Sequence, residues 1–156
     1  MKNDLACARR YLALLRILLI LPIVSLLLAG CGLLGARTPP LSPTEVTNQF
    51  YRWYIGYPGN PLVDKAYRAS PYLAESLIEE VDETLASFEL GGADPFLMAQ
   101  DIPERFTVEE ATVEGDRATV LVYLYWWSGD ENPSVLDVTL AKREGEWKII
   151  DISRQP

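Results

Sequence analysis

The chain has 156 residues, the length of a single domain, with 14 Lys and Arg against 22 Asp and Glu, for a formal net charge of −8. It contains no His and two Cys, which excludes Ser-His-Asp triads, Cys-His dyads, His-built metal sites and a disulfide framework. The acidic balance disfavours nucleic acid as a partner, because phosphate contacts need clustered Lys and Arg.

The first 30 residues differ in composition from the rest of the chain. They hold four basic residues and one acidic residue (4 − 1 = +3), whereas residues 31–156 hold 10 basic and 21 acidic residues (10 − 21 = −11). Residues 17–28 (ILLILPIVSLLL) form an uncharged run that is shorter than the roughly 20 apolar residues of a membrane-spanning helix. The pattern predicts a signal peptide over residues 1–30, with an uncleaved signal anchor as the alternative.

The apolar run ends in Leu28-Ala29-Gly30-Cys31, which resembles the lipobox of bacterial lipoproteins. The resemblance implies cleavage between Gly30 and Cys31 and acylation of Cys31, and two or three acyl chains hold a protein firmly on a membrane. Residues 31–41 then form the lipidated Cys and a flexible tether rich in Gly and Pro. The expected location is the extracytoplasmic face of a membrane in the bacterial cell envelope.

The mature domain begins with a strong helix-start signal. Ser42 and Glu45 form a capping-box pattern around Pro43, which suits the first helical position. Apolar and aromatic residues follow at helical spacing until a Pro-Gly-Asn-Pro stop at residues 58–61. A short helical piece is expected over residues 62–68.

A second amphipathic helix is predicted from Ser70-Pro71 to Gly91-Gly92. Five acidic residues occupy its polar face. They are Glu75, Glu79, Glu80, Asp82 and Glu83. We interpret them as a solvated helix face, with a cation-binding or partner-binding patch as the alternative.

After residue 104 the hydrophobic period changes to two, which predicts strands. The expected strands, joined as two hairpins, are residues 106–113, 117–127, 135–142 and 147–152. Both faces of the second strand are apolar or aromatic, so both are expected to be covered. Helices would cover one face, and the other would line a hollow.

Two to three N-terminal helices packed on a curved antiparallel sheet of about four strands make an α+β fold. A curled sheet around a long helix resembles the cone of the NTF2-like (cystatin-like) superfamily, and residues 144–152 resemble the terminal hairpin common there. Within the domain, residues 42–156, three segments resemble the DUF3828 family of bacterial envelope proteins. They are residues 50–54 (FYRWY), 70–73 (SPYL) and 94–103 (DPFLMAQDIP). The resemblance implies a fold and an envelope location, and no agreed activity.

Residues 94–103 are the strongest candidate for a ligand- or partner-binding site. Asp94, Gln100 and Asp101 stand among apolar residues there, a mixture that often lines sites on loops. The alternative is structural: Asp94 and Asp101 would accept hydrogen bonds from nearby backbone N–H groups, while Phe96 and Leu97 plug the mouth of the sheet.

Eight aromatic residues are candidates to line a pocket for a small apolar, ring-bearing or sugar ligand. They are Tyr51, Trp53, Tyr54, Tyr57, Tyr123, Tyr125, Trp126 and Trp127. The alternative is ordinary core together with some partner-facing surface. The polar loop of residues 128–133 is expected to be a plain turn, with calcium binding as its alternative.

Catalytic signatures are absent from the sequence, which has no phosphate-binding Gly loop, no GxSxG motif and no dinucleotide fingerprint. Because enzymes occur on the NTF2-like cone, the resemblance also admits a small lyase or isomerase with a buried Asp and a Tyr hydroxyl; Asp137 and Tyr54 suit by residue type. We expect instead a non-enzymatic module without catalytic residues, metal or cofactor. A hollow cone would favour a small ligand, and a filled cone with an external apolar patch would favour an envelope protein.

Overall fold

The structure, a computed structural model, describes residues 39–87 and 92–155. The predicted signal peptide, the cleavage position between Gly30 and Cys31, and most of the tether lie outside the described residues. Gly91, at the predicted end of the second helix, also lies outside them.

Helix α2 (Pro43–Ile55) begins where the capping pattern predicts. The Ser42 side chain accepts a hydrogen bond from the Glu45 N–H (3.3 Å), and the Glu45 carboxylate accepts one from the Ser42 N–H (2.8 Å). This reciprocal pair satisfies two backbone donors that a helix start otherwise leaves open. One side of α2 carries the fully buried Phe50 and Tyr51 into the core.

The segment after α2 is less helical than predicted. In place of a helix over residues 62–68, turns lead to the 3-10 helix η2 (Ala66–Ala69). Helix α3 (Glu75–Ser87) is present, but it starts at Glu75, so the start predicted at Ser70-Pro71 is wrong.

A long-range contact explains the late start of α3. The Ala74 N–H donates to the Ile149 carbonyl oxygen, and the Ile149 N–H donates to the Tyr72 carbonyl oxygen, both at 2.9 Å. These bonds place Leu73 beside Ile149 as a short parallel bridge. The backbone around Leu73 is therefore engaged with the sheet and is unavailable to a helix.

The sheet has five strands, one more than expected. They are β1 (Arg105–Val108), β2 (Thr112–Glu114), β3 (Arg117–Tyr125), β4 (Ser134–Arg143) and β5 (Glu146–Arg154). All pairings are antiparallel, in the order β1-β3-β4-β5, and β2 pairs with the other end of β3. The predicted strand over residues 106–113 is split because the Ala111 N–H donates to the Thr44 hydroxyl oxygen of α2 (3.0 Å).

The two hairpin turns use backbone conformations that favour Gly. Glu144 and Gly145 join β4 to β5 with φ of 52° and 88°, which is the two-residue turn that matches the twist of a hairpin. Gly115, between β2 and β3, has a φ of 62°. The turns are where the sequence predicts them.

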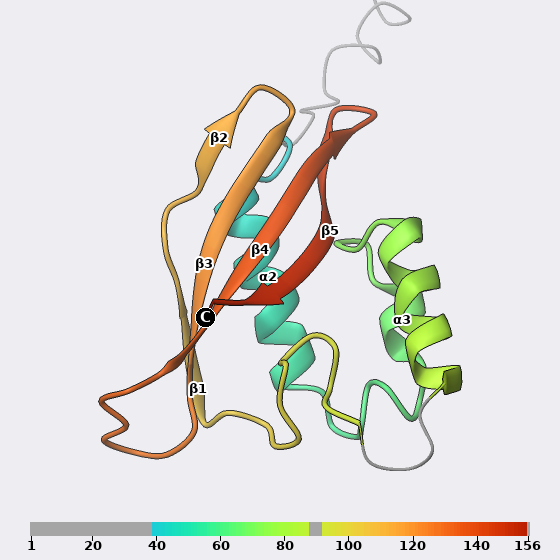
Figure 1. The fold of residues 1–156 in the computed structure, drawn as a ribbon. Coiled ribbons are helices and arrows are strands. Elements are labelled where there is room, and N and C mark those ends of the chain that lie inside the picture. Colours follow the sequence, from blue (N-terminus) through green and yellow to red (C-terminus); the bar gives the residue numbers. More distant parts are fainter. Residues whose placement is uncertain (1–38, 88–91, 156) are drawn as a thin grey trace, which may run out of the picture. The chain divides into compact units, whose positions relative to one another are not determined.

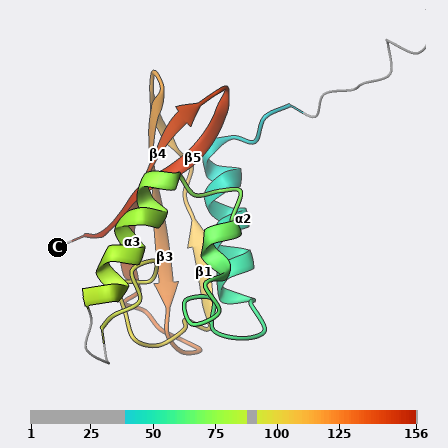
Figure 2. The same ribbon diagram turned by 90° about the vertical axis from the view of Figure 1, so that its right-hand side faces the viewer.

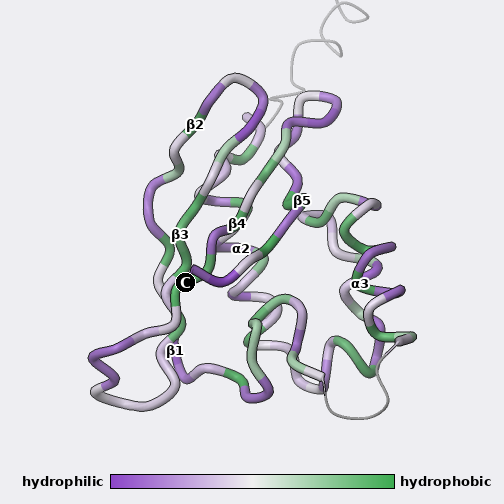
Figure 3. The backbone as a smooth tube through the Cα atoms, viewed as in Figure 1, coloured by the Kyte–Doolittle hydropathy of each residue, from purple (hydrophilic) through white to green (hydrophobic). Residues whose placement is uncertain are grey.

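The helices leave one face of the sheet uncovered. In Figure 1, α2 lies behind the sheet and α3 lies beside β5, and the turned view of Figure 2 agrees. Alternate residues of β3 are buried toward the helices: Ala118, Val120, Val122 and Leu124. Figure 3 shows the hydrophobic residues that recur along β3 and β4. Among the described residues no helix covers the opposite face, called the open face below, so the cover expected on both faces is present on one.

The space between α2 and the sheet is filled by side chains. The ring of Phe50 lies 5.2 Å from that of Tyr51 and 5.5 Å from that of Phe96, centroid to centroid. Tyr67 packs 5.6 Å from Phe96 and is fully buried. The predicted α+β arrangement of helices on an antiparallel sheet is confirmed, and its interior is an aromatic core.

Candidate functional site

Asp94 organises the start of the segment that the sequence singled out. Its Oδ1 accepts hydrogen bonds from the N–H groups of Phe96 (2.8 Å) and Leu97 (3.2 Å), and its Oδ2 accepts one from the Tyr54 hydroxyl (2.7 Å). Burial raises the pKa of Asp94, while the hydrogen bonds from Tyr54 and the two N–H groups oppose that rise. Both oxygens of this carboxylate are engaged within the fold.

Two buried tyrosines fasten this segment to α2. Tyr51 is fully buried and donates its hydroxyl to the Phe96 carbonyl oxygen (3.0 Å), and Tyr54 is 2% exposed. Burial, and then the nearby Asp94 carboxylate, raise the pKa of both phenols, so both remain neutral donors. Phe96 and Leu97 are buried in the core, as the structural interpretation of this segment predicts.

The other polar candidates have surroundings that differ from those of Asp94. Gln100 and Asp101 are exposed. Of the two aspartates expected to accept hydrogen bonds from nearby backbone N–H groups, Asp94 has this role in the structure. Asp137 pairs in register with Leu121 on the open face, and Gln155 donates to its carboxylate (3.2 Å). Asp137 and Tyr54, which suit a catalytic Asp/Tyr pair by residue type, have different partners, and the partner of Tyr54 is Asp94.

The predicted aromatic set divides among different parts of the fold. Tyr51 and Tyr54 belong to the core, whereas Tyr123 and Tyr125 are half-buried on the open face. Trp127, two residues beyond Tyr125 in the loop after β3, is 59% exposed. These residues do not line a common pocket.

A cation–π pair lies on the open face. Arg105 of β1 is opposite Tyr125 of β3, and its guanidinium lies 3.3 Å from the centroid of the Tyr125 ring. A hydrogen bond with Glu109 raises the pKa of the neighbouring Tyr123. We name the set made by Arg105, Tyr123, Tyr125 and Trp127 the open-face patch.

A buried carboxylate shapes the loop that carries Trp127. Asp130 is 4% exposed, and it accepts hydrogen bonds from the N–H groups of Trp126 and Asn132, both at 3.0 Å. The Asp130 N–H donates back to the Trp127 carbonyl oxygen (3.2 Å), closing a tight turn in which Gly129 has a φ of 83°. The plain turn predicted for residues 128–133 is present.

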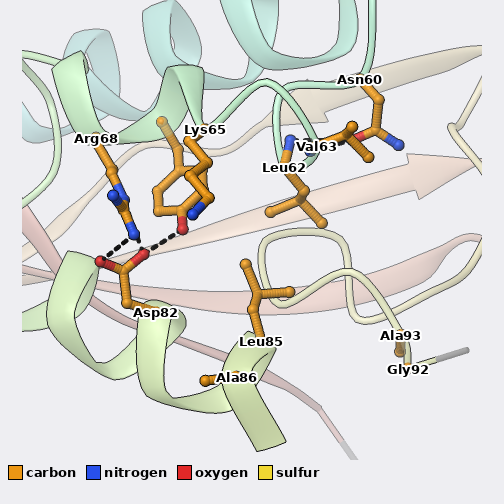
Figure 4. Close-up of a pocket in the computed structure, with 11 residues that line it drawn as sticks. Asn60, Leu62, Val63, Lys65, Arg68, Asp82, Leu85, Ala86, Gly92 and Ala93 are labelled. Atoms are coloured by element: carbon orange, nitrogen blue, oxygen red, sulfur yellow. Dashed lines mark hydrogen bonds and ion pairs between the residues drawn. The ribbon is translucent and has the colours of Figure 1, made fainter. Parts of the chain in front are cut away.

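A surface pocket of about 610 Å³ lies between residues 60–68 and α3, and Figure 4 shows the residues that line it. Arg68 and Asp82 form an ion pair at one end (2.9 Å), and the Tyr67 hydroxyl donates to the same carboxylate. The hydrogen bond from Tyr67 lowers the pKa of Asp82; burial opposes this and Arg68 adds to it. Leu62 and Leu85 form an apolar part of the wall.

An aromatic pocket of about 390 Å³ lies beside the C-terminal half of α2. Trp53 and Tyr57, both members of the predicted aromatic set, line it together with Tyr72 and Pro71. The Tyr72 hydroxyl donates to Gln49 (2.9 Å). The walls of this pocket are mainly apolar.

Sequence reasoning missed two residues that matter here. Asp82 was placed on the solvated face of α3, yet it is half-buried and ion-paired, whereas its neighbour Glu83 is exposed. The sequence does indicate this position, because Asp82 follows Ile78 by four residues and therefore lies at the border of the apolar face of the helix. No pattern in the sequence indicates Arg105, because its stacking on Tyr125 depends on the pairing of β1 with β3.

Among residues 39–87 and 92–155, no group of three or more His, Cys, Asp or Glu side chains is placed to hold a metal ion. No helix in the same ranges is long and apolar enough to cross a membrane.

Comparison with known proteins finds structural similarity alone: no family model and no curated protein matches the chain. A chain of the type VI effector–immunity complex Tae3–Tai3 from Ralstonia pickettii, in its selenomethionine form, is 27% identical with a TM-score of 0.57. The similarity covers 74% of this chain and 97% of that one. The native form of the same complex has a TM-score of 0.58 at 27% identity, over 74% and 96% of the two chains.

A protein of unknown function from Bacteroides thetaiotaomicron also shares the fold. It is 22% identical with a TM-score of 0.52, over 70% of this chain and 87% of that one. The similarity to a component of an effector–immunity complex is consistent with a protein-binding module.

Proposed function

We propose that the chain is a protein-binding module that acts at the extracytoplasmic face of a bacterial membrane. The observation that carries this proposal is the similarity to a component of the Tae3–Tai3 complex, which extends over 97% of that component. A domain that resembles almost the whole of a complex-forming protein supports protein binding more directly than a shared fragment would.

The interior of the domain supports a protein partner over a small ligand. Phe50, Tyr51 and Phe96 fill the space between α2 and the sheet, where a ligand-binding cone would be hollow. On the outside, Trp127 and the half-buried Tyr123 and Tyr125 expose aromatic surface. Exposed apolar surface of this kind is typical of interaction sites.

The partner we propose is an effector protein that reaches the cell envelope. The similar complex pairs an effector with an immunity protein, so by analogy this chain would bind an effector and cover its working surface. Acyl chains on Cys31 would hold the domain where such a protein arrives. The fold supports binding, and the lipobox supports the location.

Affinity purification of the full-length, C-terminally tagged protein from its own host tests the proposal. Proteins that co-purify from detergent-solubilised membranes are identified by mass spectrometry, produced separately and titrated against the protein by calorimetry. We expect one protein that binds at a 1:1 ratio. The proposal is overturned if no protein rebinds, and a compound of low molecular mass that binds instead would establish a ligand-binding role.

A further inference from the structure

We propose that the open-face patch, Arg105, Tyr123, Tyr125 and Trp127, is the surface on which a basic protein partner docks. The inference rests on the proposed protein-binding function and names the surface and the charge of the partner.

The patch consists of residue types that dominate binding energy at protein interfaces. Trp, Tyr and Arg are enriched among the few interface residues that carry most of the affinity. Arg105 stacks on Tyr125 at 3.3 Å, and Tyr123 follows on the same face of β3. Trp127 comes two residues after Tyr125, in the loop that follows β3. Among the described residues the helices pack elsewhere, so this face remains accessible.

Hydrogen bonds hold the backbone of the loop that carries Trp127, and the Trp127 side chain is exposed. The two carboxylate oxygens of Asp130 fix the backbone on both sides of the turn through Trp126 and Asn132. The Trp126 indole N–H donates to the Ser134 hydroxyl (3.1 Å), which anchors the loop to the start of β4. A large ring on a rigid loop loses little conformational freedom on binding, and this favours affinity.

Charge identifies the kind of partner. Four exposed acidic residues adjoin the patch along the chain: Asp101, Glu104, Glu109 and Glu131. Two basic residues nearby are engaged within the fold: Arg105 is stacked on Tyr125, and Arg154 donates to Ser134 at the start of β4. With a charge of 10 − 21 = −11 over residues 31–156, the domain would attract a partner surface rich in Lys and Arg.

Site-specific photo-crosslinking of the full-length protein in its own host tests the surface. A photoreactive benzophenone amino acid is placed at positions 123 and 127, and at Glu79 and Glu83 on the exposed face of α3 as matched controls. We expect ultraviolet light to give adducts of one protein mass from positions 123 and 127, and none from 79 and 83.

The outcomes separate this inference from the proposed function. Adducts confined to positions 79 and 83 would overturn the docking surface and leave protein binding intact. A partner that co-purifies but crosslinks at none of the four positions would also overturn the surface. No adduct together with no co-purifying protein would overturn the proposed function itself.

Binding measurements on the crosslinked partner test the chemistry. Trp127→Ala should weaken binding by roughly tenfold or more, and Trp127→Phe should weaken it less because an aromatic ring remains. Val63→Ala, which trims another exposed apolar residue (76% exposed), should leave affinity unchanged.

Binding should also weaken as ionic strength rises. Equal affinity of Trp127→Ala and the wild type, or an acidic contact surface on the partner, would overturn the inference.

Discussion

Asp94 combines features of a catalytic acid with those of a structural one. It is half-buried beside the Tyr54 hydroxyl, and desolvation raises its pKa, as at sites where a carboxyl group moves a proton. Its two oxygens, however, are engaged by Tyr54, Phe96 and Leu97. We therefore assign Asp94 the role of joining its loop to α2.

Removing the carboxyl group should destabilise the domain. Asp94→Ala leaves two backbone N–H groups and the Tyr54 hydroxyl without their acceptor, so the free energy of unfolding should fall by about 2 to 3 kcal/mol. Asp94→Asn keeps an acceptor oxygen and should cost less. Urea unfolding followed by Trp fluorescence measures both, with exposed Asp101→Ala as the control. If Asp94→Ala lowers the free energy of unfolding no more than Asp101→Ala does, Asp94 does not join its loop to α2.

The pH dependence of stability should reveal the same group. Because burial raises the pKa of folded Asp94, the folded state binds this proton more tightly than the unfolded state, where an Asp titrates near about 3.9. As the pH falls from neutral toward that value, the wild type should gain stability relative to Asp94→Asn. Thermal unfolding of both proteins at several pH values measures the stability of the wild type minus that of Asp94→Asn. If this difference decreases as the pH falls through that range, the assignment is contradicted.

At the scale of elements, α3 is attached to η2 by charge as well as by apolar contact. Asp82 accepts from the Tyr67 hydroxyl and is ion-paired with Arg68, while Leu77 and Val81 on the same helix enter the core. The polar contact links a partly exposed helix to a fully buried ring. It therefore sets how firmly α3 is held.

Asp82→Asn should loosen α3 without unfolding the sheet. Amide hydrogen exchange should become faster in residues 75–87 and stay unchanged in β3 and β4, and Glu83→Gln on the exposed face serves as the control. The hydrogen bond from Tyr67, together with Arg68, lowers the pKa of folded Asp82, so its stabilising contribution is present near neutral pH and is lost on acidification. Unchanged exchange in α3 would contradict this attachment.

The sequence predicts best those elements whose causes are local. The capping residues Ser42 and Glu45 mark the start of α2, and the alternation along β3 marks its buried face, because each depends on neighbours within a few positions. The start of α3 and the split between β1 and β2 depend on Ile149 and Thr44, which are far away in the chain. No local pattern reports such contacts.

The same distinction applies to the candidate site. The sequence indicates Asp94, Phe96 and the strand tyrosines as notable residues, since their types and surroundings are visible. It cannot show that Tyr54 is the partner of Asp94, or that Arg105 stacks on Tyr125, because both pairs form across the fold. The side of the sheet left open depends likewise on where the helices pack.

At the scale of the whole molecule, two properties define the proposed role: an acidic binding domain and a lipid anchor. The charge of −11 over residues 31–156 would repel anionic lipids, so attachment would rest on the acyl chains of Cys31. In this proposal the anchor would determine the location, and the domain would select the partner.

Metabolic labelling with a clickable fatty acid tests the anchor. Wild-type protein should take up the label and sediment with membranes, whereas Cys31→Ala should take up none, because the acceptor thiol is missing. Gel fluorescence and membrane fractionation report the result. Equal labelling of the two proteins would contradict lipidation at Cys31, and recovery of the full-length wild type in the cytosol would contradict export.

Native mass spectrometry of the full-length protein, released from the membranes of its own host in mild detergent, tests the central claim most directly. The protein-binding account predicts a complex of one acylated chain with one partner protein, which dissociates into two polypeptides on activation. A spectrum that contains the acylated chain alone, or the chain with a compound of low molecular mass, would contradict it.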